Sequence, residues 1–430
     1  MSNVSHNQRW KLPRGQVILA LLLALYYSTV ILAGVHFKVL QLLVLWGLVL
    51  VFLPAYRAPF AQSEITLLLS MTAIFMVATL SYVANGLMDH PDANLSRYAR
   101  FLFFVPIYMV IRRYATVSGF WYALLCGALV TGVWSVLEFA GWVRHPDDRW
   151  GEVSGAVNSI QFGDLSLAMA AMTCAGLPVY RRYGPAFFVA AILAVALGLF
   201  ACAASSTRGA WIAIPALTVV LGWMHLRTGF LSLRKLYLLA LAGILALIVV
   251  IPRTDVIPQV QEAVHEVKNY EKGGSAVSDV GYRFELWRAS WEIFKAHPLI
   301  GVGPGLFRTS ALALAAETGG YNSEAIQFSQ PLSEYFFVMA TLGSLGLIAL
   351  GLLWLVPLAR FVLALYAKDA DLQALGLCGA VMIVCYLHFG LTEGLMFQHA
   401  TFLGFYLLSV AVLATLINGR QRELIMEKSQ

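Results

Sequence analysis

Three arginines lie among apolar residues, and a guanidinium group is well suited to binding a phosphate. Arg208 lies in SSTRGAWIAIP, between two apolar segments whose connection is too short to leave it in bulk water. Ionisable residues at membrane depth are costly and usually functional. Beside the exposed amides of a helix start, Arg208 would form an anion site. Alternatively, Arg208 extends to the lipid headgroups and Ser205, Ser206 and Thr207 cap a helix.

Arg283 and Arg288 belong to a second basic segment, YRFELWRASWEIFKAH. Their separation of five residues does not place them on one helical face, but both can border one cavity. The alternative for Arg288 is the solvated face of a helix at the membrane surface. Arg283 stands at the start of this helix, where pairing with Asp279 or Glu285 is the alternative.

A third polar stretch, GAVNSIQFGDL, enters an apolar segment. Asn158, Gln161 and Asp164 recur every three residues and therefore share one face of a helix. This much polarity entering lipid indicates either a functional site or a hydrogen-bonded seam between helices.

Two more polar stretches border late apolar segments. HFGLTEGLMFQH contains His388, Glu393 and His399, and a histidine at a membrane edge is more often a structural hydrogen bonder than a base. QFSQPLSEYFFVMATLG contains Gln330 and Glu334. Glu334 can interact there with first-turn amides or with an arginine across a cavity.

The elements that position these residues must lie in a bilayer. Of the 430 residues, 60% are hydrophobic and 12% are charged, so a soluble core could not hide the apolar surface. Because lipid offers the backbone no hydrogen bonds, we predict an all-α fold, a polytopic bundle of about 12 transmembrane helices. The predicted spans are 16–35, 39–54, 63–84, 98–111, 118–140, 161–179, 185–203, 209–226, 236–252, 333–357, 373–390 and 397–417.

The chain divides into three predicted regions. Residues 1–252 hold nine transmembrane helices, residues 253–332 form one long loop, and residues 333–430 hold three more helices and a C-terminal tail. A loop this long is usually functional or structured. We predict amphipathic helices in it, because an aromatic stripe suits a helix that lies on the membrane or caps the bundle. The stripe consists of Phe284, Trp287, Trp291 and Phe294.

Lysine and arginine positions give an orientation. Most of them fall in the connections that lie inside if the N-terminus is cytoplasmic, so we predict both termini inside and the long loop outside. The formal charge of +6 reflects this topology, and we predict no nucleic-acid partner. The five cysteines all fall in predicted spans without metal spacing, which favours packing.

Several of these stretches together resemble the bacterial O-antigen ligase and polymerase superfamily. SSTRGAWIAIP is similar to its Ser/Thr-Arg-Gly-x-Trp element, and RFELWRASWEIFKAHPLIGVGPGLF to its long-loop signature. VNSIQFGDLSL and HFGLTEGLMF are also similar to ligase members. The order of the elements matches over most of the chain.

The resemblance implies an inverting glycosyltransferase of the bacterial inner membrane that needs no metal and no cofactor. Its long loop and active site would face the periplasm. Its donor would be an undecaprenyl-diphosphate-linked glycan, and its acceptor would be a sugar hydroxyl of the lipid A core. Membrane lipids would surround the protein. Arg208 and Arg283 would stabilise the diphosphate leaving group in place of a metal. The predicted substrate-binding residues are Arg288, Glu334, Gln330, Gln161, Asn158 and His399.

One position departs from the family pattern. Family members carry His-Asn/Ser-Glu-Tyr-Leu before the late span, and the histidine position is Leu332 here. Leucine can neither accept a proton nor donate a hydrogen bond. Either Glu334, Gln330, His388 or His399 replaces the histidine, or an unassisted hydroxyl attacks, or the chain is inactive. A polymerase, a protein O-oligosaccharyltransferase, a lipid-linked glycan transporter and a scaffold are the competing interpretations.

Overall fold

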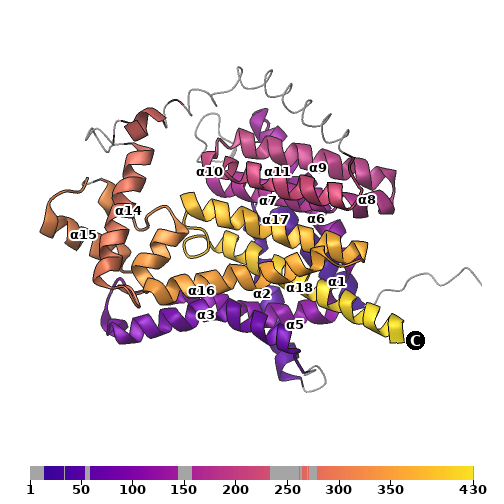
Figure 1. Ribbon diagram of the computed structural model, residues 1–430, viewed down its shortest axis with the longest axis horizontal. Helices are drawn as coiled ribbons and strands as arrows, with labels where there is room; N and C mark the ends of the chain where they lie inside the picture. Colours follow the sequence, from indigo (N-terminus) through magenta and orange to yellow (C-terminus); the bar gives the residue numbers. More distant parts are fainter. Residues whose placement is uncertain are drawn as a thin grey trace, which may run out of the picture.

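The chain is described by a computed structural model that covers residues 14–32, 34–53, 59–143, 157–232, 261, 264–268, 270, 278–322 and 324–429. Within these ranges every regular element is a helix (Figure 1), as the apolar windows predict. The predicted span 236–252 and most of the first part of the long loop lie outside the described residues.

The helices follow the predicted spans closely in most places. Their bounds are α1 Arg14–Thr29, α2 Val35–Phe52, α3 Gln62–Ala84, η2 Leu87–Asp89, α4 Ser96–Ala99, η3 Arg100–Phe103, α5 Phe104–Tyr114, α6 Val117–Phe139, α7 Ser159–Ala175, α8 Leu177–Tyr183, α9 Pro185–Ala204, α10 Arg208–Trp211, α11 Ala213–Arg227, α14 Asp279–Ala296, α15 Phe307–Thr318, η5 Ala325–Gln327, α16 Glu334–Leu365, α17 Ala370–Thr392 and α18 Ala400–Ser429.

Eight helices within the described ranges are long and apolar enough to cross a membrane, or nine if the bent pair α7 and α8 forms one span. The chain is therefore a polytopic membrane protein, and a total of about twelve spans stays a prediction. Some predicted spans are broken. The segment 98–111 is divided among α4, η3 and α5, and 161–179 bends by 59° between α7 and α8.

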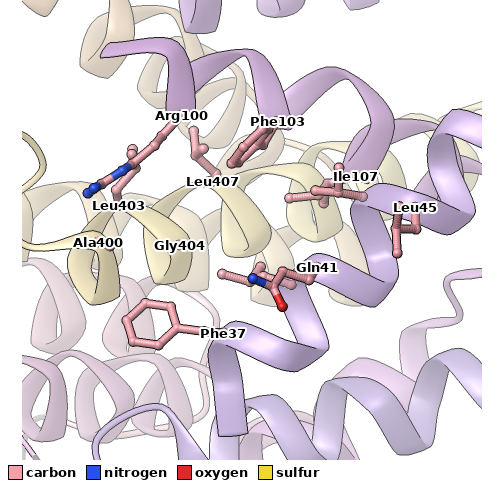
Figure 2. A pocket seen from close by; sticks show the side chains of 12 residues that line it. Phe37, Gln41, Leu45, Arg100, Phe103, Ile107, Ala400, Leu403, Gly404 and Leu407 are labelled. Carbon is pink, nitrogen blue, oxygen red and sulfur yellow. The ribbon is translucent and has the colours of Figure 1, made fainter. Parts of the chain in front are cut away.

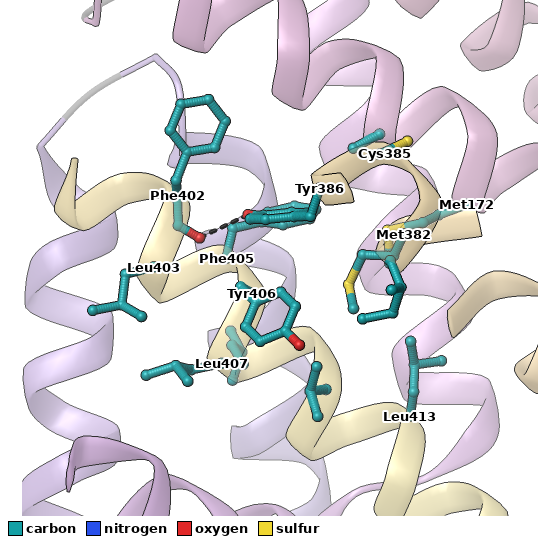
Figure 3. Close-up of a cluster of buried hydrophobic side chains, with 14 of the residues drawn as sticks. Met172, Met382, Cys385, Tyr386, Phe402, Leu403, Phe405, Tyr406, Leu407 and Leu413 are labelled. Carbon is teal, nitrogen blue, oxygen red and sulfur yellow. Dashed lines mark hydrogen bonds between the residues drawn. The ribbon is translucent and has the colours of Figure 1, made fainter. Parts of the chain in front are cut away.

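Helices α17 and α18 lie at the centre of the bundle. Their apolar windows are 78% and 89% buried inside the protein, against 28% for α2 and for α9, so the latter two present most of their surface to lipid. Figure 3 shows the contact between the two central helices, where the Tyr386 hydroxyl donates to the carbonyl of Phe402 at 2.7 Å. Lipid gives helices little hydrophobic reason to associate, so such close packing and internal hydrogen bonds hold the bundle together.

A break in α16 receives the turn that follows α14. The amide of Ser344 donates to the carbonyl of Pro298 at 2.8 Å, and the amide of Gly303 donates to that of Thr341 at 2.9 Å. At the break, Gly343 has φ 64° and ψ −157°, a conformation that only glycine adopts readily. A Cβ there would lie 2.5 Å from the carbonyl carbon of Leu299. The Pro-Leu-x-Gly-x-Gly motif thus fixes the long loop to the bundle.

We expect Gly343→Ala to destabilise the protein, because both the backbone conformation and the contact with the 298–303 turn exclude a side chain. The free energy of unfolding should fall by about 1–3 kcal/mol, which would appear as a lower melting temperature of the purified protein in detergent. Gly351→Ala is the matched control in the same helix, since nothing lies within 4 Å of its added Cβ. Equal melting temperatures for the two variants would contradict this account of the break.

Helix α14 stands across one end of the bundle, at the left of Figure 1. Trp287 stacks on Phe336 of α16 with ring centroids 5.0 Å apart and an angle of 12° between the planes. Its indole Nε1 donates to the carbonyl of Pro331 at 2.9 Å. Of the two interpretations of the aromatic stripe, these contacts favour a helix that caps the bundle. Capping brings the start of α14 over the loop that precedes α16.

Candidate functional site

The predicted site residues come from helix ends that meet beneath α14. Except for Arg288, they lie at or just before the starts of α7, α10, α14, α16 and α18, and Thr392 at the end of α17 contacts two of these elements. The connector between α17 and α18, residues 393–399, lies among them. Residues more than 200 positions apart in the chain therefore share one site.

Arg283 joins three of these elements. Its Nη1 donates a hydrogen bond to the carbonyl of Leu332 at 3.1 Å and another to the carbonyl of Thr392. The guanidinium is half-buried, and the Thr392 carbonyl carries part of the negative end of the α17 dipole. Arg283 thus reaches from α14 to the loop before α16 and to the end of α17, and two backbone carbonyls help to fix its guanidinium.

Arg208 opens α10 on the other side of Thr392. A Cβ on the next residue, Gly209, would lie 2.3 Å from the Thr392 Oγ1, so the α10 backbone is in direct contact with the end of α17. Arg208 itself is half-buried. The helix-capping alternative finds no support at Thr207, whose hydroxyl makes no capping bond and instead donates to the carbonyl of Ser159 at 2.9 Å. Arg208 and Arg283 therefore stand on elements that meet at one residue.

Glu393 is the centre of a hydrogen-bonded network in the connector. Its Oε1 accepts from the Gln330 Nε2 and from the Gly394 amide, both at 3.0 Å. The His399 Nε2 lies 3.6 Å from the same oxygen. Glu393 is only 4% exposed, and its Oε2 has no hydrogen-bond partner among the residues described. One carboxylate oxygen is thus engaged and the other is available.

Two predicted residues of α7 extend this network. The Gln161 Nε2 lies 2.8 Å from the His399 Nδ1, and the Asn158 Oδ1 accepts from the Gln161 amide at 2.7 Å as the N-cap of α7. The structure therefore brings Asn158, Gln161, His399 and Gln330 together around Glu393. Asn158 and Gln161 of the polar face of α7 thus belong to this cluster, whereas Asp164 is buried and its Oδ1 has no hydrogen-bond partner in the described part of the chain.

Glu334 is fully buried beside the same connector. Its Oε1 accepts from the Met396 amide at 3.1 Å, while its Oε2 is buried with no hydrogen-bond partner in the described part of the chain. The sequence predicts that Glu334 contacts amides of its own first helical turn or an arginine. Its Oε1 instead accepts from the Met396 amide of the connector. Neighbouring Ser333 donates to the Gly390 carbonyl at 3.1 Å, so this helix start fixes the end of α17 and the connector together.

Arg288 lies apart from the Arg283 contacts. It is exposed, its Nη1 donates to the Gly320 carbonyl at 3.2 Å, and its guanidinium lies 4.6 Å from the centre of the Tyr321 ring. Burial raises the pKa of Tyr321, although the positive charge of Arg288 opposes the rise. The exposure of Arg288 favours the alternative that it belongs to the solvated face of α14. Its contact with substrate stays a prediction.

Leu332 has φ 51°, a left-handed conformation that is costly for a leucine. This conformation directs its carbonyl to Arg283. The hydrogen bond from Arg283 thus gives the backbone of Leu332 a role at the site, even though the leucine side chain can neither accept nor donate a proton. His388, one of the alternatives for the missing histidine, bonds through Nδ1 to the Val384 carbonyl at 2.7 Å within its own helix.

Two members of the site were not predicted as site residues. Glu393 follows α17 directly, and its signal was a carboxylate between two histidines in HFGLTEGLMFQH. Arg97 donates through Nη1 to the Gln398 Oε1 at 2.5 Å, which places a further arginine beside the connector. Arg97 is a loop residue in the sequence, and nothing there indicates that it reaches the connector 300 residues later.

Comparison with known proteins gives two findings. A family model described as O-antigen ligase matches residues 192–351, a range that includes Arg208, Arg283 and Leu332. An uncharacterized protein of Haemophilus influenzae is 20% identical over 388 residues, which cover 86% of this chain and 91% of that protein. This match supports the resemblance over residues 192–351, which hold SSTRGAWIAIP and the long-loop signature.

Proposed function

We propose that this chain is an O-antigen ligase-like glycosyltransferase. It moves a glycan from undecaprenyl diphosphate to a sugar hydroxyl of the lipid A core, at the membrane face where α14 covers the bundle. The family match supports the superfamily, whose members are glycosyltransferase-like membrane enzymes. The donor and acceptor are those that the resemblance implies, and the orientation is the one that the lysine and arginine positions predict.

The observation that carries the proposal is the meeting of two arginine-bearing elements at Thr392. The Arg283 guanidinium bonds its carbonyl, and the α10 backbone beside Arg208 lies against its hydroxyl. A diphosphate leaving group gains negative charge as the glycosidic bond breaks, and fixed guanidinium groups stabilise that charge in the transition state. Arg208 and Arg283 are the two candidates for this task.

The reaction is a single displacement. The acceptor hydroxyl oxygen attacks the anomeric carbon, the bond from that carbon to the diphosphate oxygen breaks, and the electron pair leaves with the diphosphate. The configuration at carbon is thereby inverted. The hydroxyl proton passes to the Glu393 Oε2, the carboxylate oxygen without a partner among the described residues. His399 and Gln330 hold the opposite oxygen and so position the base.

Glu393 is better placed to act as the general base, in place of the family histidine, than the four residues that the sequence suggests for this role. His388 is engaged within its own helix, and Glu334 is wholly buried under the connector. Gln330 is an amide that cannot take a proton at neutral pH. His399 receives a contact on each ring nitrogen, from Gln161 and Glu393, which suits it to orienting Glu393.

Leu332→His tests this assignment. Because Glu393 already provides the base, we expect the change to alter the transfer rate less than tenfold. Leu332→Gly is the control, since glycine adopts the left-handed conformation without the cost that leucine bears. A rise of a hundredfold or more for Leu332→His alone would mean that the native chain lacks a base.

The activity is tested with the purified full-length protein, an undecaprenyl-diphosphate-linked glycan and lipid A core in detergent. Glycan joined to lipid A core supports the ligase. Longer glycan on the undecaprenyl carrier would instead identify a polymerase, and glycan on added protein an oligosaccharyltransferase. Unchanged donor and acceptor would contradict the proposed enzyme.

A further inference from the structure

A groove of about 580 Å³ runs along the outside of the bundle, between α2, η3, α5 and α18 (Figure 2). Its walls are almost entirely apolar. The lining residues include Phe37, Leu40, Phe103, Ile107, Leu403 and Leu407. The groove is separate from the arginine pair at Thr392, and the function proposed above does not use it.

The groove is open to the side that lipid covers. Phe37, Phe103 and Leu45 line it and are 38%, 48% and 60% exposed, and α2 is one of the helices apolar enough to span a membrane. From Phe37 to Leu45 the wall of α2 spans nine residues, or about 12 Å of helix. The shape and chemistry suit a hydrocarbon chain that enters from the bilayer.

One end of the groove carries a positive charge. Figure 2 shows Arg100 beside Ala400 and Leu403, at the end opposite Leu45 and Ile107. Arg100 is half-buried and has no hydrogen bond or ion pair with any described residue, and its nearest charged neighbour is another arginine, Arg97. A partly buried charge without a partner is costly, and this one would be balanced by an anion bound at the groove end.

The charged end of the groove adjoins the candidate active site. Arg97 holds the Gln398 side chain, His399 belongs to the Glu393 network, and Ala400 lines the groove. Three consecutive residues therefore connect the two places. Thr392, where the elements that carry Arg208 and Arg283 meet, lies at the other end of the same connector.

We propose that the groove holds an acyl chain of the acceptor, a phosphorylated glycolipid, with one of its phosphates on Arg100. The proposal rests on the proposed function. The donor diphosphate already has Arg208 and Arg283 at the Thr392 end of the connector, so a second lipid substrate needs another approach. The groove supplies one at the Gln398 end, with an apolar channel for the chain and a cation for the headgroup. The two lipids thus reach Glu393 from opposite sides.

The test measures equilibrium binding of lipid A to the full-length protein in nanodiscs of zwitterionic lipid, without donor. Arg100→Gln is expected to weaken binding about tenfold, the loss typical of a hydrogen bond to a charged group. Arg308→Gln is the matched control, since Arg308 is an exposed arginine of α15 that does not line the groove. Lipid A stripped of its acyl chains is expected to bind the native protein and both variants more weakly than intact lipid A does, because it cannot fill the groove.

A second variant tests the channel itself. Ala400→Phe fills the charged end and should weaken lipid A binding, whereas Leu42→Phe, on the exposed face of α2 outside the groove, should not. Thermal unfolding confirms that each variant is folded. In the transfer assay, Arg100→Gln should raise the KM for lipid A core and leave the KM for the donor unchanged.

The possible failures are distinguishable. Unchanged lipid A binding in both Arg100→Gln and Ala400→Phe would overturn the groove proposal while leaving transferase activity intact. A raised KM for the donor alone would assign the groove to the polyprenyl chain and also overturn it. Native protein that binds lipid A through Arg100 but transfers no glycan would overturn the proposed function and leave the groove site standing.

Discussion

Arg283→Ala is expected to reduce the turnover number for glycan transfer by about 10²–10³-fold, the usual cost of removing one fixed donor that stabilises transition-state charge. Its guanidinium is half-buried and is held by the carbonyls of Leu332 and Thr392, so little reorganisation is needed when the diphosphate leaves. Arg208→Ala is expected to act similarly. The measurement is product formation by purified protein at saturating donor and acceptor.

A matched control separates catalysis from folding. Arg283 also fixes backbone, so its loss could lower activity by unfolding the loop before α16. Arg283→Lys keeps the charge but not the planar group, and should recover part of the rate. Arg288→Ala removes an exposed arginine from the same helix and should cost less than tenfold. Equal losses for Arg283→Ala and Arg288→Ala would contradict the special place given to Arg283.

Glu393→Gln is expected to lower the turnover number by about 10²–10⁴-fold, the usual contribution of a general base. The substitution keeps the shape of the side chain and an oxygen that accepts from Gln330 and Gly394. The network should therefore survive while the basic oxygen is lost. Transfer rates measured in single turnovers would isolate this step from product release.

Glu334→Gln is the control for Glu393. Glu334 is a second buried carboxylate close to the connector, and we assign it to positioning the Met396 amide. A neutral amide can still accept that bond, so this variant should keep most of its activity. If Glu334→Gln lost as much as Glu393→Gln, or if Glu393→Gln were fully active, Glu393 would not be the base.

Much of the helical fold is predictable because the bilayer leaves so little choice. Continuous apolar windows predict α2, α3, α6 and α9 to within a few residues. The windows fail where tertiary contacts interrupt a helix. The break at Gly343 depends on a turn more than 40 residues earlier, and no local pattern shows that the two segments meet.

The candidate site is predictable for its charges but not for its geometry. Arg208 and Arg283 are conspicuous because each is costly near lipid, and the structure places Arg283 and the backbone next to Arg208 beside Thr392. Glu393 escapes prediction because its importance comes from contacts with Gln330 and His399, which depend on how helix ends converge. The unpaired Arg100 is equally hidden, since only the packed bundle, in the part of the chain that the structure describes, shows the groove beside it.

The most direct test of the central claim is transfer of glycan from undecaprenyl diphosphate to lipid A core by purified native protein and by the Arg208→Ala, Arg283→Ala double variant. Our account predicts inverted product from the native protein and none detectable from the folded double variant. Native-level transfer by the double variant would contradict it.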